Sequence, residues 1–191
     1  VKTDDSSADG LYLELSGSRE LTATTSMTGS IGSRYSDAGD IFRFYQGEGQ
    51  NPGDTQDIEG IGNPFQNNYV TLGMSFSKNR TSAEGSLLFS DEDYEAAETP
   101  DRTMVGIRGS VTRQFRSDLD GTIGVDLYKR DYDLDGRSDF DSRLYGELRW
   151  QYSRTIEARI RYDRADRRSN AVGGDYSENR VFLILGYSPD L

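Results

Sequence analysis

The sequence predicts an all-β protein whose strands form an antiparallel up-and-down transmembrane β-barrel. The first observation is a sustained period of two: between positions 143 and 152, apolar residues such as Leu148 alternate with charged residues such as Glu147. Such alternation is typical of a strand with one apolar and one polar face. The second observation is that tight turns alternate with long polar loops, which is the asymmetry of transmembrane barrels. We therefore expect the apolar face to contact lipid.

The composition excludes several classes of protein. The chain has 191 residues and a net charge of −11, and it contains neither Cys nor His. Disulfides, thiol catalysis, imidazole bases and His-ligated metal sites are therefore excluded, and the acidic balance argues against a nucleic-acid partner. No apolar run approaches the roughly 18 residues that a membrane helix needs. The low apolar content would also fit a disordered chain, but disorder does not produce alternating columns.

The first two strands are expected to form a hairpin. Residues 1–9 are rich in Asp and Ser and are expected to form a loop. Alternation over 11–16 predicts the first strand, which breaks near 19–21, and alternation over 24–31 predicts the second. The segment 36–67 is rich in Gly, Asn, Asp and Gln, and this composition predicts a long extracellular loop.

We expect the whole chain, residues 1–191, to form a single β-barrel domain. The first hairpin occupies 10–35, the long extracellular loop 36–67, and the remaining strands 68–188. An aromatic patch at 41–45 lies inside the loop. This patch either extends a strand or folds back over an opening of the barrel.

Seven further strands follow from the same alternation. They are expected at 70–77, 83–89, 105–112, 119–127, 143–152, 156–163 and 181–187. The tight turns between them are expected near 78–80, 116–118 and 153–155. The long polar loops are expected at 91–102, 130–141 and 164–177. Together with the first hairpin, this pattern predicts about 9–10 strands, depending on the role of the aromatic patch.

Aromatic residues gather beside the tight turns and the C-terminus, where a barrel has its interfacial girdle. Amphipathic rings prefer the depth of the lipid headgroups, so they mark the border of the membrane. The residues predicted to form this girdle are Phe76, Phe115, Trp150, Tyr152 and Tyr187. The membrane-barrel interpretation therefore rests on the turns and the aromatics as well as on the strands.

The polar column of the strands is expected to line the interior of the barrel. The candidate lumen-lining residues are Arg108, Asp120, Asp126, Arg143, Glu147, Arg149, Glu157, Arg159 and Arg161. A three-residue turn at 153–155 would place Gln151 opposite Glu157, Arg149 opposite Arg159, and Glu147 opposite Arg161. One interpretation is a water-filled lumen whose Arg groups guide an anionic solute such as an acidic polysaccharide. The other is a set of ion pairs that satisfy each other and close the lumen.

Residues 131–139 contain part of a calcium-loop pattern. Carboxylates stand at the first, third and fifth positions, and Gly136 stands at the sixth, where a sharp turn is needed. The candidate calcium ligands are Asp131, Asp133, Asp135 and Asp139. The twelfth position holds Ser142, where a bidentate Glu would normally complete the shell. A solvated Asp-rich loop explains the same residues, so the two interpretations stay open. We expect no other cofactor.

The sequence does not select a set of catalytic residues. Acidic residues are abundant, but no spacing singles out one pair for acid–base work, so we expect no enzyme and assign no catalytic residue. Three function classes remain. They are a barrel that passes a solute or polymer, a structural barrel that anchors or ensheathes a partner protein, and a soluble carbohydrate-binding β-sandwich.

Two segments near the C-terminus are distinctive: residues 152–156 are Tyr-Ser-Arg-Thr-Ile, and residues 175–183 are Asp-Tyr-Ser-Glu-Asn-Arg-Val-Phe-Leu. They resemble the closing strands of bacterial outer-membrane β-barrels, in the porin family of the type associated with exopolysaccharide export loci. The resemblance extends over most of the chain as a repeated hairpin pattern. It implies a place in the outer membrane of a Gram-negative bacterium and a role in transport or polysaccharide export. It also implies contact with membrane lipid and lipopolysaccharide, and with periplasmic or extracellular partner chains.

The sequence departs from this family at its end. Such barrels often finish on an aromatic residue, whereas this chain finishes Ser-Pro-Asp-Leu at 188–191, after Tyr187. Single-chain bacterial barrels have an even number of strands with both ends in the periplasm. The sequence pattern gives nine strong strands, which is an odd number. If the last strand ends in the periplasm, the first of these nine strands begins outside the cell. We therefore expect these residues to be the C-terminal part of a larger barrel.

Overall fold

The computed structural model describes residues 12–36, 65–95, 99–134 and 136–188. The described residues form nine strands. The strands are β1 (Leu13–Thr22), β2 (Thr25–Ser36), β3 (Phe65–Lys78), β4 (Thr81–Tyr94), β5 (Arg102–Arg116), β6 (Leu119–Tyr132), β7 (Ser138–Gln151), β8 (Ile156–Ser169) and β9 (Tyr176–Tyr187). No helix among the described residues is long and apolar enough to cross a membrane.

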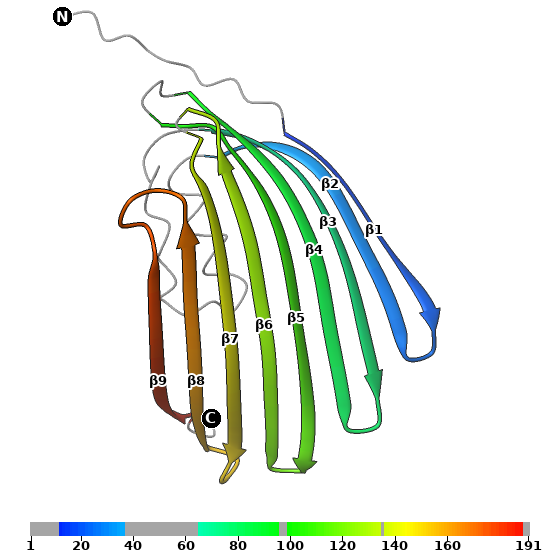
Figure 1. Cartoon of the computed structure of the whole chain (residues 1–191). Helices are drawn as coiled ribbons and strands as arrows, with labels where there is room; N and C mark the ends of the chain where they lie inside the picture. The colour runs from blue at the N-terminus through cyan, green and yellow to red at the C-terminus, as the bar shows by residue number, and fades with distance from the viewer. Residues whose placement is uncertain (1–11, 37–64, 96–98, 135, 189–191) are drawn as a thin grey trace, which may run out of the picture.

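All nine strands belong to one antiparallel sheet in which each strand pairs with its neighbours in sequence, from β1 to β9. Figure 1 shows the sheet curving, with the tight turns at one end and the long connections at the other. Within the described residues, β1 and β9 are the two edges and do not pair with each other. The predicted all-β, up-and-down arrangement is therefore confirmed. The number of strands in the closed barrel stays a prediction.

Most strands are longer than the apolar alternation predicts. The first strand does not break near 19–21 but continues to Thr22, and β9 begins at Tyr176 rather than at 181. β4 and β5 extend into the acidic segment that was expected to be a loop. The reason is that ladder hydrogen bonds need only backbone groups, so pairing continues where the apolar side chains end. The aromatic patch at 41–45 lies outside the described residues.

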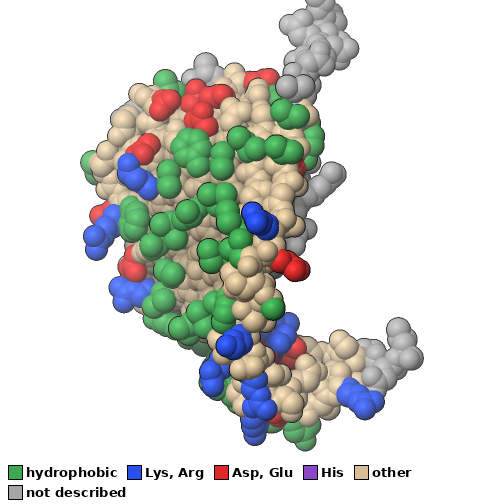
Figure 2. All heavy atoms as spheres, turned by 90° about the vertical axis from the view of Figure 1, so that its right-hand side faces the viewer, with side chains coloured by type: hydrophobic (Ala, Val, Ile, Leu, Met, Phe, Trp, Pro, Cys, Tyr) green, Lys and Arg blue, Asp and Glu red, His purple; other side chains and the backbone are tan. Residues whose placement is uncertain are grey.

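The outer face of the sheet carries a continuous belt of exposed apolar side chains, which we call the apolar belt. Ile123 is 65% exposed and Leu183 is 72% exposed. Its other large members on the central strands are Val70, Leu72, Met74, Leu87, Phe89, Val105, Ile107, Val111, Val125, Leu144, Leu148 and Ile160. Figure 2 shows hydrophobic side chains spread across the face that it presents. A surface this apolar is unfavourable in water and is what a lipid-facing barrel wall requires.

The apolar belt crosses the sheet obliquely. On β1 it includes Leu13 and Leu15 and ends before Arg19, whereas on β8 it ends at Tyr162, just before Arg164. Arg19 and Arg164 nevertheless lie in one register row, which is a line of successive cross-strand partners through β2 to β7. A belt that stays at one height in the membrane crosses the register rows in this way only if the strands are tilted from the membrane normal, and barrel closure requires such a tilt.

The inner face, which carries the alternate side chains, contains rings that lie flat on glycines of the neighbouring strand. The cross-strand pairs are Tyr69 on Gly32, Tyr128 on Gly106, and Tyr145 on Gly124. A Cβ atom at Gly106 would lie 2.7 Å from the ring of Tyr128, which is closer than real Cβ contacts. These glycines therefore allow the rings to lie along the wall instead of projecting from it.

The belt predicts that a charge is tolerated near the turn but not at mid-membrane. Ile160→Arg places a guanidinium in the middle of the belt and should destabilise the folded state by ~2–4 kcal/mol, whereas Ile156→Arg, beside the tight turn, should cost only ~0–1 kcal/mol. Urea unfolding in lipid vesicles measures both changes. An equal loss of unfolding free energy for Ile160→Arg and Ile156→Arg would contradict a lipid-facing belt.

The ring contacts predict that two glycines of β5 differ in their tolerance of a methyl group. Gly106→Ala should destabilise the fold by ~1–3 kcal/mol, because the Tyr128 ring must move off the wall. That movement would also break the 2.7 Å hydrogen bond from Arg108 to the Tyr128 hydroxyl. Gly109→Ala is the matched control, because its Cβ would meet no described atom closer than 3.8 Å. The unfolding free energies of both variants test this, and a larger loss at Gly109 would contradict it.

Candidate functional site: the charged inner face

The inner face of β5 to β9 is lined by arginines that form ion pairs with carboxylates. Asp139 and Asp163 are fully buried, with no exposed side-chain surface. A buried carboxylate without a partner would be strongly destabilising, so each has arginines beside it. The ion pairs stack in layers between the tight turns and the long connections, and we describe them from the middle outward.

The middle layer is centred on Asp163 of β8. The Nε atom of Arg161 donates to both carboxylate oxygens of Asp163, at 3.0 and 3.2 Å. Arg143, on neighbouring β7, donates to Asp163 at 3.4 Å. Arg161 also lies 3.8 Å from Glu147 and stacks over the Tyr145 ring, 4.5 Å from its centroid. The ring and the two guanidinium groups therefore surround one buried negative charge.

A second layer lies nearer the long connections. Asp139 pairs with Arg137 at 2.7 Å, and Asp141 accepts a 2.6 Å hydrogen bond from Arg167 of β8. Arg130 of β6 pairs with the other oxygen of Asp141. The two arginines that bind Asp141 are largely buried. Their ion pairs join β6, β7 and β8 at a height where the outer faces of these strands lie beyond the apolar belt.

The layer nearest the tight turns is the most accessible to solvent. Arg149 donates to one oxygen of Asp120 from two nitrogens, at 2.9 and 2.7 Å, and Arg159 pairs with Glu157. Arg149 and Arg159 are cross-strand partners, and their side chains are 49% and 43% exposed. Two arginines at neighbouring positions therefore face the interior, each with guanidinium donors left for a further anion.

The structure places all nine predicted lumen-lining residues on the inner face. The three cross-strand pairs expected from the turn at 153–155 are confirmed by the register of β7 and β8. Arg108 and Asp126, on β5 and β6, lie 3.4 Å apart. The pairs do not form one continuous ladder but separate layers. Whether these residues line an open lumen stays a prediction.

Several residues of this face were not selected from the sequence. They are Glu92, Arg102, Arg130, Arg137, Asp141, Asp163, Arg167 and the three tyrosines that lie on glycines. Most of them fall in segments that were expected to be loops. Continuing the alternation through the charged residues beyond the apolar belt would have placed them on the same face. Asp139, which was selected as a candidate calcium ligand, pairs with Arg137 in the structure.

The inner face of β1 to β3 has a different chemistry. Its side chains are mainly small hydroxyl groups, and some bond across the strands: Ser26 to Ser75 at 2.6 Å and Ser30 to Thr71 at 2.5 Å. The small side chains leave a hollow of about 500 Å³, at which the carboxylate of Glu14 lies. The interior wall therefore has a hydroxyl side and a charged side.

The aromatic residues predicted to form a girdle all lie at the tight-turn end of the strands. Trp150 and Tyr152 contact each other edge to face, with centroids 5.3 Å apart. The indole nitrogen of Trp150 donates to Asp118 in the neighbouring turn at 3.1 Å. This arrangement, with the apolar part outward and the polar atom toward the turn, suits the border of a membrane.

The predicted calcium ligands that the structure describes do not lie together in one cluster. Asp131 lies on the outer face, where it pairs with Lys129 at 2.7 Å, whereas Asp139 is buried on the inner face. No group of three acidic side chains among the described residues is arranged to hold a metal ion. Asp135 lies outside the described residues. The calcium site stays a prediction.

Comparisons with known proteins agree with this geometry. Residues 95–187 match the family described as "Putative beta-barrel porin 2". No curated protein matches the sequence.

The fold is similar to solved structures of OmpT, an outer membrane protein of Vibrio cholerae. The in-vitro folded form has a TM-score of 0.67 at 11% identity, over 94% of this chain and 56% of that one. A loop L8 deletion mutant gives 0.65 at 11% identity, over 93% and 53%. The form expressed in the outer membrane gives 0.59 at 11% identity, over 82% and 45%. This chain thus spans 56% of the length of the first structure.

At this identity the structures establish the fold, and the porin match adds the family resemblance. One sheet with an apolar outer face also excludes the soluble sandwich. The chain therefore has the fold of an outer-membrane β-barrel, resembles the bacterial porin barrels as its sequence indicated, and lies in the outer membrane of a Gram-negative bacterium.

Proposed function

We propose that this sheet is part of the wall of an outer-membrane channel that passes an anionic solute or polymer, with acidic polysaccharides as the substrate class. The observation that carries the proposal is the pair Arg149 and Arg159, which lie side by side on the inner face and are about half exposed. Guanidinium groups bind carboxylate and sulfate groups through paired hydrogen bonds, and they remain charged at any physiological pH.

The deeper ion pairs serve the shape of this channel rather than binding of the solute. Asp163 and its arginines are largely buried, so their charges are neutralised within the wall. A fully paired wall holds its side chains against the sheet and leaves the exposed arginines to set the selectivity. The hydroxyl side of the wall offers neutral hydrogen-bonding groups to sugar hydroxyls, which suits a charged polysaccharide. The proposal assigns no catalytic residue.

A structural barrel that anchors or ensheathes a partner protein is the second candidate. The observation that favours it is the pairing itself: even exposed Arg149 and Arg159 each have a carboxylate partner, in Asp120 and Glu157. Cations neutralised in this way attract a passing anion less strongly than free ones. In this alternative the ion pairs fill the interior and no solute crosses.

Planar bilayer recordings separate the two candidates. A channel should show stepwise conductance. In a salt gradient, the double variant Arg149→Gln, Arg159→Gln should shift the reversal potential toward the equilibrium potential of the cation, because two positive charges of the inner face are lost. The matched control is Arg113→Gln, because Arg113 is an exposed cation of the outer face near the same turns. This control should leave selectivity unchanged.

Two outcomes would contradict the channel proposal. Absence of stepwise conductance from correctly folded protein would favour the structural barrel. An equal shift in the control variant would show that surface charge in general, rather than the inner pair, sets the selectivity.

A further inference from the structure

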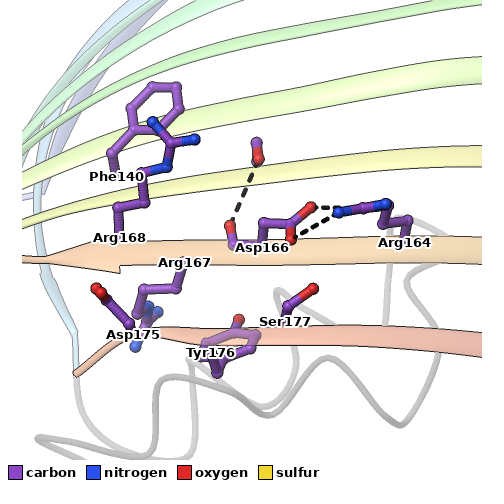
Figure 3. A pocket seen from close by; sticks show the side chains of 9 residues that line it. Phe140, Arg164, Asp166, Arg167, Arg168, Asp175, Tyr176 and Ser177 are labelled. Atoms are coloured by element: carbon purple, nitrogen blue, oxygen red, sulfur yellow. Dashed lines mark hydrogen bonds and ion pairs between the residues drawn. The ribbon is translucent and has the colours of Figure 1, made fainter. Parts of the chain in front are cut away.

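The outer face of β7 to β9 contains a hollow beside the long connections. Its volume is about 560 Å³, and its outward-facing lining residues are Phe140, Ser142, Arg164, Asp166, Arg168 and Ser177. Figure 3 shows Arg168 beside Phe140 and the Arg164 side chain directed at Asp166. Most of this lining lies on the face that carries the apolar belt; the rest is Asp175 and two inward-facing residues, Tyr176 and Arg167, of which Arg167 belongs to the second ion-pair layer.

The cations of the hollow stand directly above the apolar belt. On β8 the belt ends at Tyr162, and Arg164 is the next residue on the same face. With a rise of about 3.4 Å per residue and a strand tilt of about 40°, Arg164 lies about 5 Å and Arg168 about 15 Å beyond Tyr162 along the membrane normal. The headgroup layer is about 5–8 Å thick on each side of the hydrocarbon core, so Arg164 lies within it and Arg168 lies beyond it, at a height that only the sugars of a large lipid headgroup reach.

The hollow also lies on the external side of the membrane. Tight turns of such barrels face the periplasm and long connections face outward. The hollow lies beside the connection between β8 and β9, at the end of the sheet opposite the tight turns (Figure 1). Its headgroup layer is therefore that of the outer leaflet, whose main lipid carries phosphorylated sugars.

The charges of the hollow suit such a lipid. Lys129, Phe140 and Arg168 are successive partners in one register row, so an aromatic ring lies between two cations. The Arg168 side chain forms no close ion pair or hydrogen bond with the part of the chain that the structure describes, and its charge acts at longer range on the Asp166 carboxylate. The same outer rim on β4 carries the carboxylates Asp91 and Asp93. On β6 to β8 it carries the cations Lys129, Arg164 and Arg168, of which Lys129 pairs with Asp131 and Arg164 pairs with Asp166.

The carboxylates of the hollow already have donors. Asp166 accepts from Arg164 at 2.9 Å, which holds that guanidinium in place with other donors still available. Asp175 accepts a 2.6 Å hydrogen bond from the backbone of Ser169. A phosphate group would therefore share Arg164 with Asp166 and bind to the guanidinium donors that Asp166 leaves open.

We propose that Arg164, Arg168 and Lys129 bind the phosphate groups of lipopolysaccharide in the outer leaflet. The guanidinium groups donate to phosphate oxygens, and Phe140, which is 44% exposed, packs against the lipid between them. The site fixes the height of β6 to β8 in the membrane. Lipid binding at this site does not depend on whether the interior conducts, so this proposal can be tested independently of the channel proposal.

Thermal unfolding of the protein, purified from outer membranes in detergent, tests this site. Added lipopolysaccharide should raise the unfolding midpoint, because a ligand that binds only the folded state stabilises it. The variant Arg168→Gln, and the double variant with Arg164→Gln, should lose most of that rise. The matched control is Lys78→Gln with Arg113→Gln, two exposed outer-face cations on the periplasmic side of the belt, which should keep the rise.

Two further ligands identify the source of the phosphate. Dephosphorylated lipopolysaccharide should stabilise the wild type and the Arg168 variant equally, and inorganic phosphate at the same phosphate concentration should stabilise neither. The site would be overturned if the periplasmic-side control lost as much of the lipopolysaccharide-induced rise in unfolding midpoint as the Arg168 variant. It would also be overturned if the double variant kept the full rise. A phosphate-induced rise that Arg168→Gln abolishes would overturn the assignment to the lipid.

Discussion

The pairing of backbone groups between neighbouring strands is the constraint on which the rest of this structure depends. Lipid offers no hydrogen bonds, so a backbone group that crosses the membrane must bond within the protein. Strands β2 to β8 satisfy this condition on both sides through a series of antiparallel ladders, and β1 and β9 satisfy it on the side of their one described neighbour. Once the ladders are formed, side chains alternate strictly between two faces. This alternation assigns one face of each strand to lipid and the other to the interior.

Among the residues that the structure describes, the inner face has few buried apolar side chains and is held by charges and rings. Asp163 is fully buried, and its contacts with Arg143 and Arg161 join β7 to β8. Such a group is costly to desolvate, and removing one partner leaves an unpaired charge, so these contacts favour one arrangement more than they add net stability. The tyrosines that lie on glycines also favour one arrangement, because only the glycine leaves space for the ring to lie along the wall.

The two sides of the interior wall differ, and so do the two borders of the outer face. Hydroxyl groups line β1 to β3 inside, and ion pairs line β5 to β9. Outside, the aromatic residues Trp150 and Tyr152 lie at the tight-turn border, and the cations Arg164 and Arg168 lie at the other.

The sequence by itself determined the face of each belt residue and the partners of Arg149 and Glu147, because alternation has a strict period and a short turn sets the register. It could not determine where the strands end, since backbone pairing continues past Tyr162 without apolar side chains. Nor could it show that Asp139 meets Arg137 rather than the other acidic residues of its loop. Only the tertiary structure decided these contacts and the outer hollow, because both depend on distances between side chains of tilted neighbouring strands.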